Sequence, residues 1–402
     1  MSINPSRGFR DYLVITGGYW AFTLTDGAIR MLVALYFHGI GYSPLEIAML
    51  FLFYEFFGVV TNLVGGWIGS RLGLNVTMHV GMALQVIALG MLTIDSSWLT
   101  VPYVMFAQAL SGIAKDLNKM SAKAGVKLIF SSDSSGKLFR WIAALTGSKN
   151  ALKGIGFFVG GALLSWIGFR RALFTLATSL FVVFLITLFL LPKDLGRSKT
   201  KAKFRQIFSK SRDVNFLSAA RFFLFGSRDV WFVVALPVFL TAVLGWDSMA
   251  VGAFLAFWVI GYGIVQAFAP RFFRASPHSS PDGRSVLLWT FPLMIIPAVI
   301  ATSLMASLDP RITLVAGLTV FGVFFAVNSS IHSFLIVNYA EQDKVAMNVG
   351  FYYMANAGGR LTGTVLSGWI YQQWGLAACL WCSAGFIGVA GLISTKLPSK
   401  QK

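Results

Sequence analysis

Charged residues are scarce in this chain of 402 residues, making up 12% of it, whereas hydrophobic residues make up 56%. Soluble domains carry about 25% charged residues. A share as low as 12% excludes an ordinary soluble protein. The apolar residues fall in blocks of about 20, the length that a helix needs to cross a bilayer core. The sequence therefore predicts an all-α integral membrane protein.

Cysteine and the motifs of enzymes are also nearly absent. The two cysteines, Cys379 and Cys382, stand in an apolar block without further metal ligands nearby, so we expect no metal site. The motifs HExxH, GxSxG and GxxxxGK[ST] do not occur, which argues against a metalloprotease, a hydrolase and an ATP-driven pump. We expect no catalytic residue, no cofactor, and a protein that is not an enzyme.

Acidic residues are few, 15 against 33 basic ones, which gives a net charge of +18. The basic residues outside the apolar blocks lie in connecting loops, so they indicate topology and not nucleic-acid binding. With both termini assigned to the cytoplasm, only Arg170, Arg171 and Arg311 fall on the opposite side. This asymmetry predicts a multi-pass protein with both termini cytoplasmic.

The apolar blocks predict twelve membrane-spanning helices in two pseudo-symmetric six-helix lobes. The predicted spans are about residues 12–37, 45–68, 76–94, 98–120, 140–167, 171–191, 215–243, 249–270, 286–307, 312–338, 347–372 and 376–395. The longest hydrophilic connection is strongly basic. It divides the chain into an N-terminal lobe (1–191), a basic cytoplasmic linker (192–214) and a C-terminal lobe (215–402).

An internal repeat supports the two lobes. At a constant offset of 207 residues, a cation and three glycines recur in the fifth and eleventh spans: Lys153 with Arg360, Gly156 with Gly363, Gly161 with Gly368, and Gly168 with Gly375. Two six-span repeats joined by a basic loop are typical of a secondary transporter.

Eight basic residues and only four acids fall inside the predicted spans. The bases are Arg30, Lys115, Lys119, Lys149, Lys153, Arg221, Arg228 and Arg360, and the acids are Asp26, Glu55, Asp116 and Asp229. A charge at the bilayer centre costs about 2.5–3.5 kcal/mol on insertion scales. The surplus of cations predicts a cavity that binds a multiply charged anion.

We assign roles to these residues from their positions. The predicted substrate-binding set is Arg30, Lys115, Asn118, Lys119, Lys149, Lys153, Arg228 and Arg360, and the candidates for proton coupling are Asp26, Asp116 and Asp229. Lys153 and Arg360 are expected to face each other across the lobes. A structural alternative is open for Asp26 and Arg30, which are one helical turn apart and can neutralise each other.

A glycine-rich stretch, Gly66-Trp67-Ile68-Gly69-Ser70-Arg71-Leu72-Gly73, joins the second and third spans. It resembles the loop signature of the major facilitator superfamily, in which such a loop helps to latch the lobes. Gly66, Gly69, Arg71 and Gly73 match the signature, whereas Ser70 stands where the family usually has Asp. The resemblance implies the major facilitator fold with a gating loop here.

Four stretches of the N-terminal half resemble one branch of that superfamily, the ArsJ-type organoarsenical efflux permeases. They are residues 11–35, 41–66, 109–123 and 145–161, the last reading LTGSKNALKGIGFFVGG. The resemblance implies export of 1-arseno-3-phosphoglycerate by alternating access across a bacterial inner membrane, which confers arsenate resistance. A glyceraldehyde-3-phosphate dehydrogenase would be the functional partner that makes this ester. We expect a monomer that contacts this small anion and the bilayer.

Other functions stay open at this stage. A transporter exchanging ordinary organic phosphates for inorganic phosphate needs the same cationic cavity, because arsenate and phosphate esters differ little in charge or shape. A multidrug exporter of lipophilic cations would need an acidic cavity, and a structural or sensory membrane protein would not need repeated mid-span cations.

Overall fold

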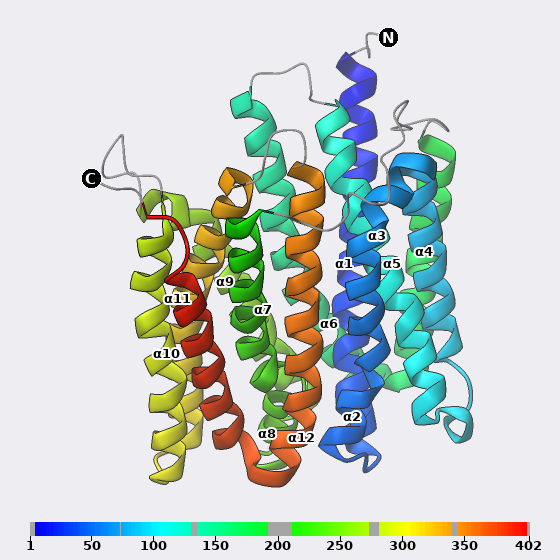
Figure 1. Cartoon of the computed structure of the whole chain (residues 1–402). Helices are drawn as coiled ribbons and strands as arrows, with labels where there is room; N and C mark the ends of the chain where they lie inside the picture. Colours follow the sequence, from blue (N-terminus) through cyan, green and yellow to red (C-terminus); the bar gives the residue numbers. More distant parts are fainter. Residues whose placement is uncertain are drawn as a thin grey trace.

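The computed structural model describes residues 5–72, 74–129, 135–191, 211–272, 281–339 and 345–399. Helices dominate these residues, and the start of α1 and the end of α12 lie at the same end of a long bundle (Figure 1). In chain order the helices are α1 (Pro5–Gly39), α2 (Pro44–Leu50), α3 (Leu52–Leu72), α4 (Leu74–Met91), the 3-10 helix η1 (Ser96–Trp98), α5 (Val101–Ile129), α6 (Ser135–Leu190), α7 (Arg212–Phe232), α8 (Ala235–Ala242), α9 (Ser248–Phe272), α10 (Gly283–Met305), α11 (Pro310–Tyr339) and α12 (Val345–Ser394).

Two of these helices contain a break at a left-handed glycine. Gly168 in α6 has φ 77°, and Gly375 in α12 has φ 76°. Glycine adopts this conformation without steric cost because it has no Cβ atom. The orange part of α12 descends through the bundle and its red part returns (Figure 1). The predicted spans 140–167 and 171–191, and likewise 347–372 and 376–395, are therefore joined without a loop.

Two other predicted spans are interrupted. Span 45–68 is divided at Phe51 into α2 and α3, and span 215–243 is divided near Val233 into α7 and α8. With each of these pairs taken as one crossing, and α6 and α12 as two each, the described helices are consistent with the twelve predicted spans. The predicted linker (192–214) lies outside the described residues up to residue 210, so the division into lobes there stays a prediction.

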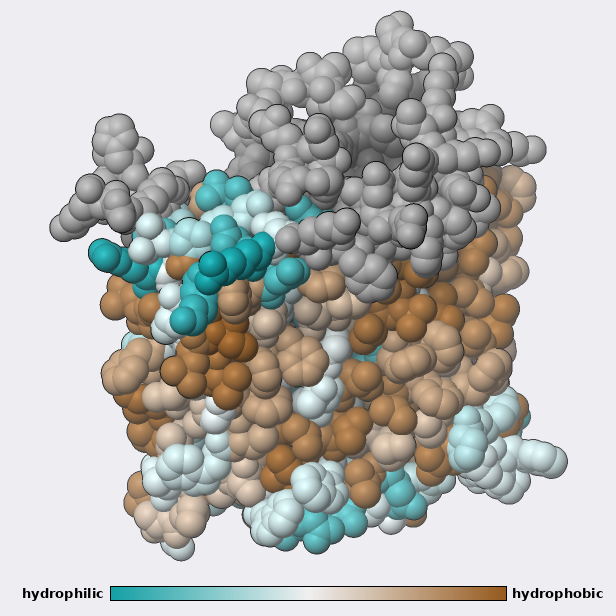
Figure 2. All heavy atoms as spheres, in the orientation of Figure 1, coloured by the Kyte–Doolittle hydropathy of each residue, from teal (hydrophilic) through white to brown (hydrophobic). Residues whose placement is uncertain are grey.

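The outer surface is apolar, as a bilayer requires. Seven helical segments among the described residues are long and apolar enough to cross a membrane. Phe189, Phe257 and Leu288 are 81%, 75% and 72% exposed, far more than water tolerates for so large a patch. A hydrophobic belt covers the middle of the face drawn in Figure 2, with hydrophilic residues at its two ends.

Glycines allow close helix crossings within each half, at repeat-related positions. A Cβ atom on Gly156 of α6 would lie 3.0 Å from Cα of Gly27 in α1. A Cβ atom on Gly363 of α12 would lie 2.7 Å from the carbonyl oxygen of Gly226 in α7. Small residues permit such approaches in membrane helices. Helix α6 therefore packs closely against α1, and α12 packs against α7 in the same way.

A second pair of repeat glycines makes contacts between the halves. Gly161 of α6 packs against Gly252 of α9, whose Cα atom would lie 3.3 Å from an added Cβ atom. Gly368 of α12 packs against Pro44, whose carbonyl oxygen would lie 2.5 Å away. Gln372 also accepts a hydrogen bond from the backbone of Leu45 (3.1 Å). These contacts join the halves near the end of the bundle opposite the start of α1.

Replacing Gly156 or Gly363 with alanine should destabilise the protein by about 1–3 kcal/mol, because each new methyl group would overpack against backbone that cannot yield. The matched control is Gly17→Ala on α1, where nothing lies within 4 Å of an added Cβ atom. Thermal unfolding in detergent would report the change. A Gly156→Ala protein as stable as the Gly17→Ala protein would contradict the crossing.

Candidate functional site

One cavity lies between the two halves and has an empty volume of about 1430 Å³, including the part that reaches solvent. Helices α1, α3, α5, α6, α7, α9, α11 and α12 contribute to its wall. All eight predicted intramembrane cations line it, together with three of the four acids: Arg30, Lys115, Lys119, Lys149, Lys153, Arg221, Arg228, Arg360, Asp26, Asp116 and Asp229. In the sequence these charges lie on five separate predicted spans.

The cavity occupies one side of the contacts between the halves. On α6 its wall ends at Phe157, before Gly161, and on α12 it ends at Arg360, before Gly368. A small apolar void beyond it is lined by Arg30 and by Met31, Phe51, Phe157, Phe232 and Val233. The cavity is therefore closed off from the end of the bundle that carries Gly168 and Gly375.

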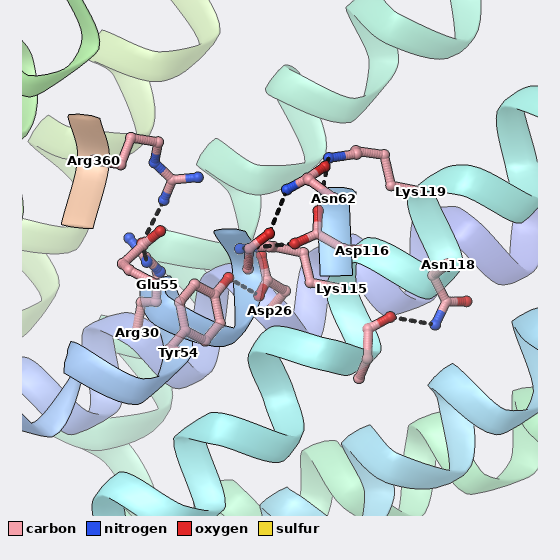
Figure 3. A network of polar contacts seen from close by, with 12 residues as sticks. Asp26, Arg30, Tyr54, Glu55, Asn62, Lys115, Asp116, Asn118, Lys119 and Arg360 are labelled. Carbon is pink, nitrogen blue, oxygen red and sulfur yellow. Dashed lines mark hydrogen bonds and ion pairs between the residues drawn. The ribbon is translucent and has the colours of Figure 1, made fainter. Parts of the chain in front are cut away.

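A buried carboxylate, Glu55 of α3, connects the charges of the two halves. Its Oε1 atom accepts hydrogen bonds from Nη2 of Arg30 on α1 and from Nη2 of Arg360 on α12, the latter at 2.6 Å. Glu55 is 0% exposed, and its other oxygen has no hydrogen-bond partner among the described residues. Figure 3 shows the carboxylate between the two guanidinium groups. One acid thus neutralises a cation from each half.

The chain of charges continues into the second half through Asp229 of α7. Nε of Arg360 donates to Oδ2 of Asp229 at 3.1 Å, and Nε of Arg228 donates to Oδ1 at 2.6 Å. Positive and negative groups therefore alternate along Arg30, Glu55, Arg360, Asp229 and Arg228. Each guanidinium presents several donors to a carboxylate, the geometry that arginine satisfies best.

Asp26 of α1 has a different partner from the one its spacing allowed. Its Oδ1 atom accepts a hydrogen bond of 2.5 Å from the hydroxyl of Tyr54 on α3 (Figure 3). Arg30 turns instead to Glu55 and lies over the ring of Tyr54, with Cζ 4.4 Å from the ring centroid. Asp26 and Arg30 therefore do not form the structural pair that was left open.

The two deep lysines of α5 share one acid. Nζ of Lys119 lies 2.6 Å from Oδ1 of Asp116, and Nζ of Lys115 lies 3.8 Å from Oδ2. Lys119 also donates to the amide oxygen of Asn62 at 2.5 Å. Lys115 lies over the ring of Tyr54 at 4.0 Å from its centroid. Because one acid offsets only one of the two lysines, the group keeps about one positive charge and attracts an anion less than two free lysines would.

Two of the lining cations have no carboxylate within ion-pair distance among the residues that the structure describes. Nζ of Lys153 lies 5.7 Å from the ring centroid of Phe157. Arg221 donates through Nη1 to the carbonyl oxygen and hydroxyl of Ser329, at 3.2 and 3.1 Å. Arg360, the repeat partner of Lys153, holds two acids. Lys153 and Arg221 therefore each contribute positive charge to the cavity without a carboxylate close by in the described part of the chain.

Asn118 is not brought to the cavity. Its amide donates to the carbonyl oxygen of Ala114 at 3.0 Å, and it packs against Gly81 of α4. Figure 3 shows it apart from the charged cluster. The structure therefore places Asn118 in the packing between α5 and α4, outside the wall of the cavity, and its contact with substrate stays a prediction. The predicted gating-loop residues Gly66, Gly69 and Arg71 lie in the last turns of α3. The side chain of Arg71 and the whole of Gly73 lie outside the described part of the chain.

Sequence reasoning assigned no role to Glu55 or Arg221, although both stood among the intramembrane charges. The signal was present, because an acid or a base in a predicted span is costly wherever it lies. What the sequence lacked was the pairing: Glu55 meets Arg360 across 305 positions, and Arg221 meets Ser329 across 108.

Comparisons with known proteins agree with this architecture. A family model described as the Major Facilitator Superfamily matches residues 15–296. A crystal structure of a mutant of the nucleoside transporter NupG superposes with a TM-score of 0.73, covering 97% of this chain and 99% of that one at 14% identity. At this identity the likeness shows the fold alone. A search of curated protein sequences found no match.

Replacing Glu55 with glutamine should destabilise the protein by about 3–5 kcal/mol, because it leaves two buried guanidinium groups without their shared acid. Thermal unfolding would be compared with that of Glu46→Gln, the same change at an exposed carboxylate of α2. Added phosphate should raise the melting temperature of Glu55→Gln more than that of the wild type. Equal melting of the two variants would show that Glu55 does not hold the network.

Proposed function

Because the chain belongs to the major facilitator superfamily, we propose that it is a secondary active transporter that exports a small organic anion bearing phosphate or arsenate groups. The substrate that we favour is 1-arseno-3-phosphoglycerate, on the resemblance of residues 11–35, 41–66, 109–123 and 145–161 to the ArsJ-type permeases. Export of this ester would confer arsenate resistance. The superfamily already makes the chain a multi-pass membrane transporter, not an enzyme.

The observation that carries the proposal is the convergence of eight cations on one cavity that only three acids share. Such a surplus in a low-dielectric site attracts a multiply charged anion strongly. Lipophilic cations, the substrates of many exporters, would be repelled. A nucleoside, which the name of NupG suggests for that protein, is uncharged and would not offset the charge of this wall.

Glu55 would link the binding of an anion to the conformational change of alternating access. In the empty carrier Glu55 serves as the counter-ion of Arg30 and Arg360. An anion entering from the cavity would bind the same guanidinium groups and compete with Glu55 for them. Since Arg360 belongs to the second half and Glu55 to the first, weakening this pair loosens a connection between the halves. Binding would thus favour the rearrangement that moves the substrate.

Several further elements of the proposal follow from its topology and substrate. We propose a bacterial inner membrane location with both termini cytoplasmic, a monomer, and a glyceraldehyde-3-phosphate dehydrogenase as the functional partner that supplies the ester. An ordinary organic phosphate exchanged for inorganic phosphate is the second candidate. The cavity favours it equally, because its cations recognise charge and not the central atom.

Everted vesicles should accumulate arsenic only when the dehydrogenase, its phosphorylated aldehyde substrate, NAD and arsenate are all present. Lys153→Gln should reduce this uptake at least tenfold while leaving membrane insertion intact, because Lys153 lines the cavity and has no carboxylate within ion-pair distance in the described ranges. Arg311→Gln, an exposed charge outside the cavity, is the control. Equal uptake of 3-phosphoglycerate alone would favour the organic phosphate antiporter.

We expect inward proton flow to drive export, with Asp26 as the first candidate among Asp26, Asp116 and Asp229. Asp26 lines the cavity and is bonded to a hydroxyl, whereas Asp116 and Asp229 are held by cations. Asp26→Asn should keep substrate exchange but lose accumulation driven by a pH gradient, and Tyr54→Phe should weaken both only modestly. Wild-type transport that ignores a collapsed pH gradient would remove proton coupling.

A further inference from the structure

Arg221 of α7 is a buried cation that has no ion pair with any residue in the described ranges. It is 4% exposed and lines the cavity. Its described hydrogen bonds are to the carbonyl oxygen and the hydroxyl of Ser329 on α11. A buried charge without an opposite charge is costly, so an anion bound next to Arg221 would stabilise it.

The guanidinium group of Arg221 lies against two aromatic rings and is hydrogen-bonded by Ser329. The ring of Phe225 lies 3.9 Å from Cζ, and the ring of Tyr352 lies 5.1 Å away. Nη1 is occupied by Ser329, which is itself fixed by the hydroxyl of Tyr262 at 3.2 Å. Stacking on aromatic rings and hydrogen bonding together fix the orientation of an arginine. The group is therefore preorganised.

The opposite edge of the guanidinium carries donors that have no hydrogen-bond partner among the described residues. Nε is buried and has no hydrogen-bond partner among the described residues, and Nη2 has none either. This edge, with two parallel N–H groups, is the one that binds a carboxylate or phosphoryl group through two hydrogen bonds. A buried donor without a partner also costs stability, and a bound anion would remove this cost.

Arg221 is separated from the other cations of the cavity. It lies seven residues before Arg228 on α7, which corresponds to about 10 Å along the helix. Lys153, the other lining cation without a carboxylate, lies in the first half on α6. Lys153 and Arg221 thus line one cavity from different halves of the chain.

We propose that Arg221 forms a second anion subsite, and that the transported molecule carries an anionic group at each end. One end would bind at Lys153 with Arg30 and Arg360, and the other, a carboxylate or a second phosphoryl or arsenyl group, would bind the open edge of Arg221. This inference rests on the proposed function and narrows its substrate class to anions charged at both ends. Such a ligand contacts both halves at once.

The test compares ligands that differ only at the second end, using ligand-induced thermal stabilisation of the purified full chain. The probes are 3-phosphoglycerate, which has a phosphate and a carboxylate, and glycerol 3-phosphate, which lacks the carboxylate. The wild type should bind the first about tenfold more tightly, the change in Kd that one charged hydrogen-bonded pair supplies. Arg221→Gln should abolish this preference and change the Kd of glycerol 3-phosphate less than twofold.

Two variants separate binding from folding. Arg212→Gln removes the same charge from α7 outside the cavity and should keep the preference. Arg221→Lys keeps the charge but loses the two parallel N–H groups of the guanidinium, so it should retain only part of the preference for 3-phosphoglycerate. This variant provides the test if Arg221→Gln does not fold. Equal weakening of both ligands in the Arg221 variants would overturn the subsite, as would a wild type that binds both equally. A wild type that binds neither ligand would instead contradict the proposed anion transport.

Discussion

The structure depends on one shared carboxylate. Glu55 has no exposed surface and lies behind the cavity, yet its Oε1 atom meets a guanidinium from each half. Without it, Arg30 and Arg360 would repel each other in a medium that screens charge poorly. With Glu55 between them, the two guanidinium groups are held at fixed positions in the wall of the cavity. The acid that is hidden from the ligand therefore determines where the ligand can bind.

The charged wall in turn requires a close approach of helices, which glycine provides. Gly27 and Gly156 bring α1 to α6, and Gly226 and Gly363 bring α7 to α12. Arg30 and Lys153 stand within a turn of the first crossing, and Asp229 and Arg360 within a turn of the second. The glycines therefore set a short distance between the helices, and this distance brings the charged side chains within reach of one another.

Much of this could be predicted from the sequence, for physical reasons. Hydropathy predicts the spans because lipid requires long apolar helices, and the repeat at an offset of 207 correctly pairs Gly168 with Gly375, the two left-handed breaks. The cations converge on one cavity because a charged side chain that faced lipid would be energetically costly. Partners could not be predicted, because side-chain pairing is set by helix rotation: Arg30 turns to Glu55 and not to Asp26, and Asn118 turns to α4.

The left-handed glycines have a consequence for motion. Because α6 and α12 each reverse at a single residue, with φ near 77° and 76°, the two arms of each hairpin have no slack between them. We therefore expect the two arms of each hairpin to tilt together. The first arms carry the contacts to the opposite half, Gly161 to α9 and Gly368 to α2, so a tilt on the inner side is transmitted to the outer, lipid-facing arm. The bilayer around the second arms therefore resists or assists every transport cycle.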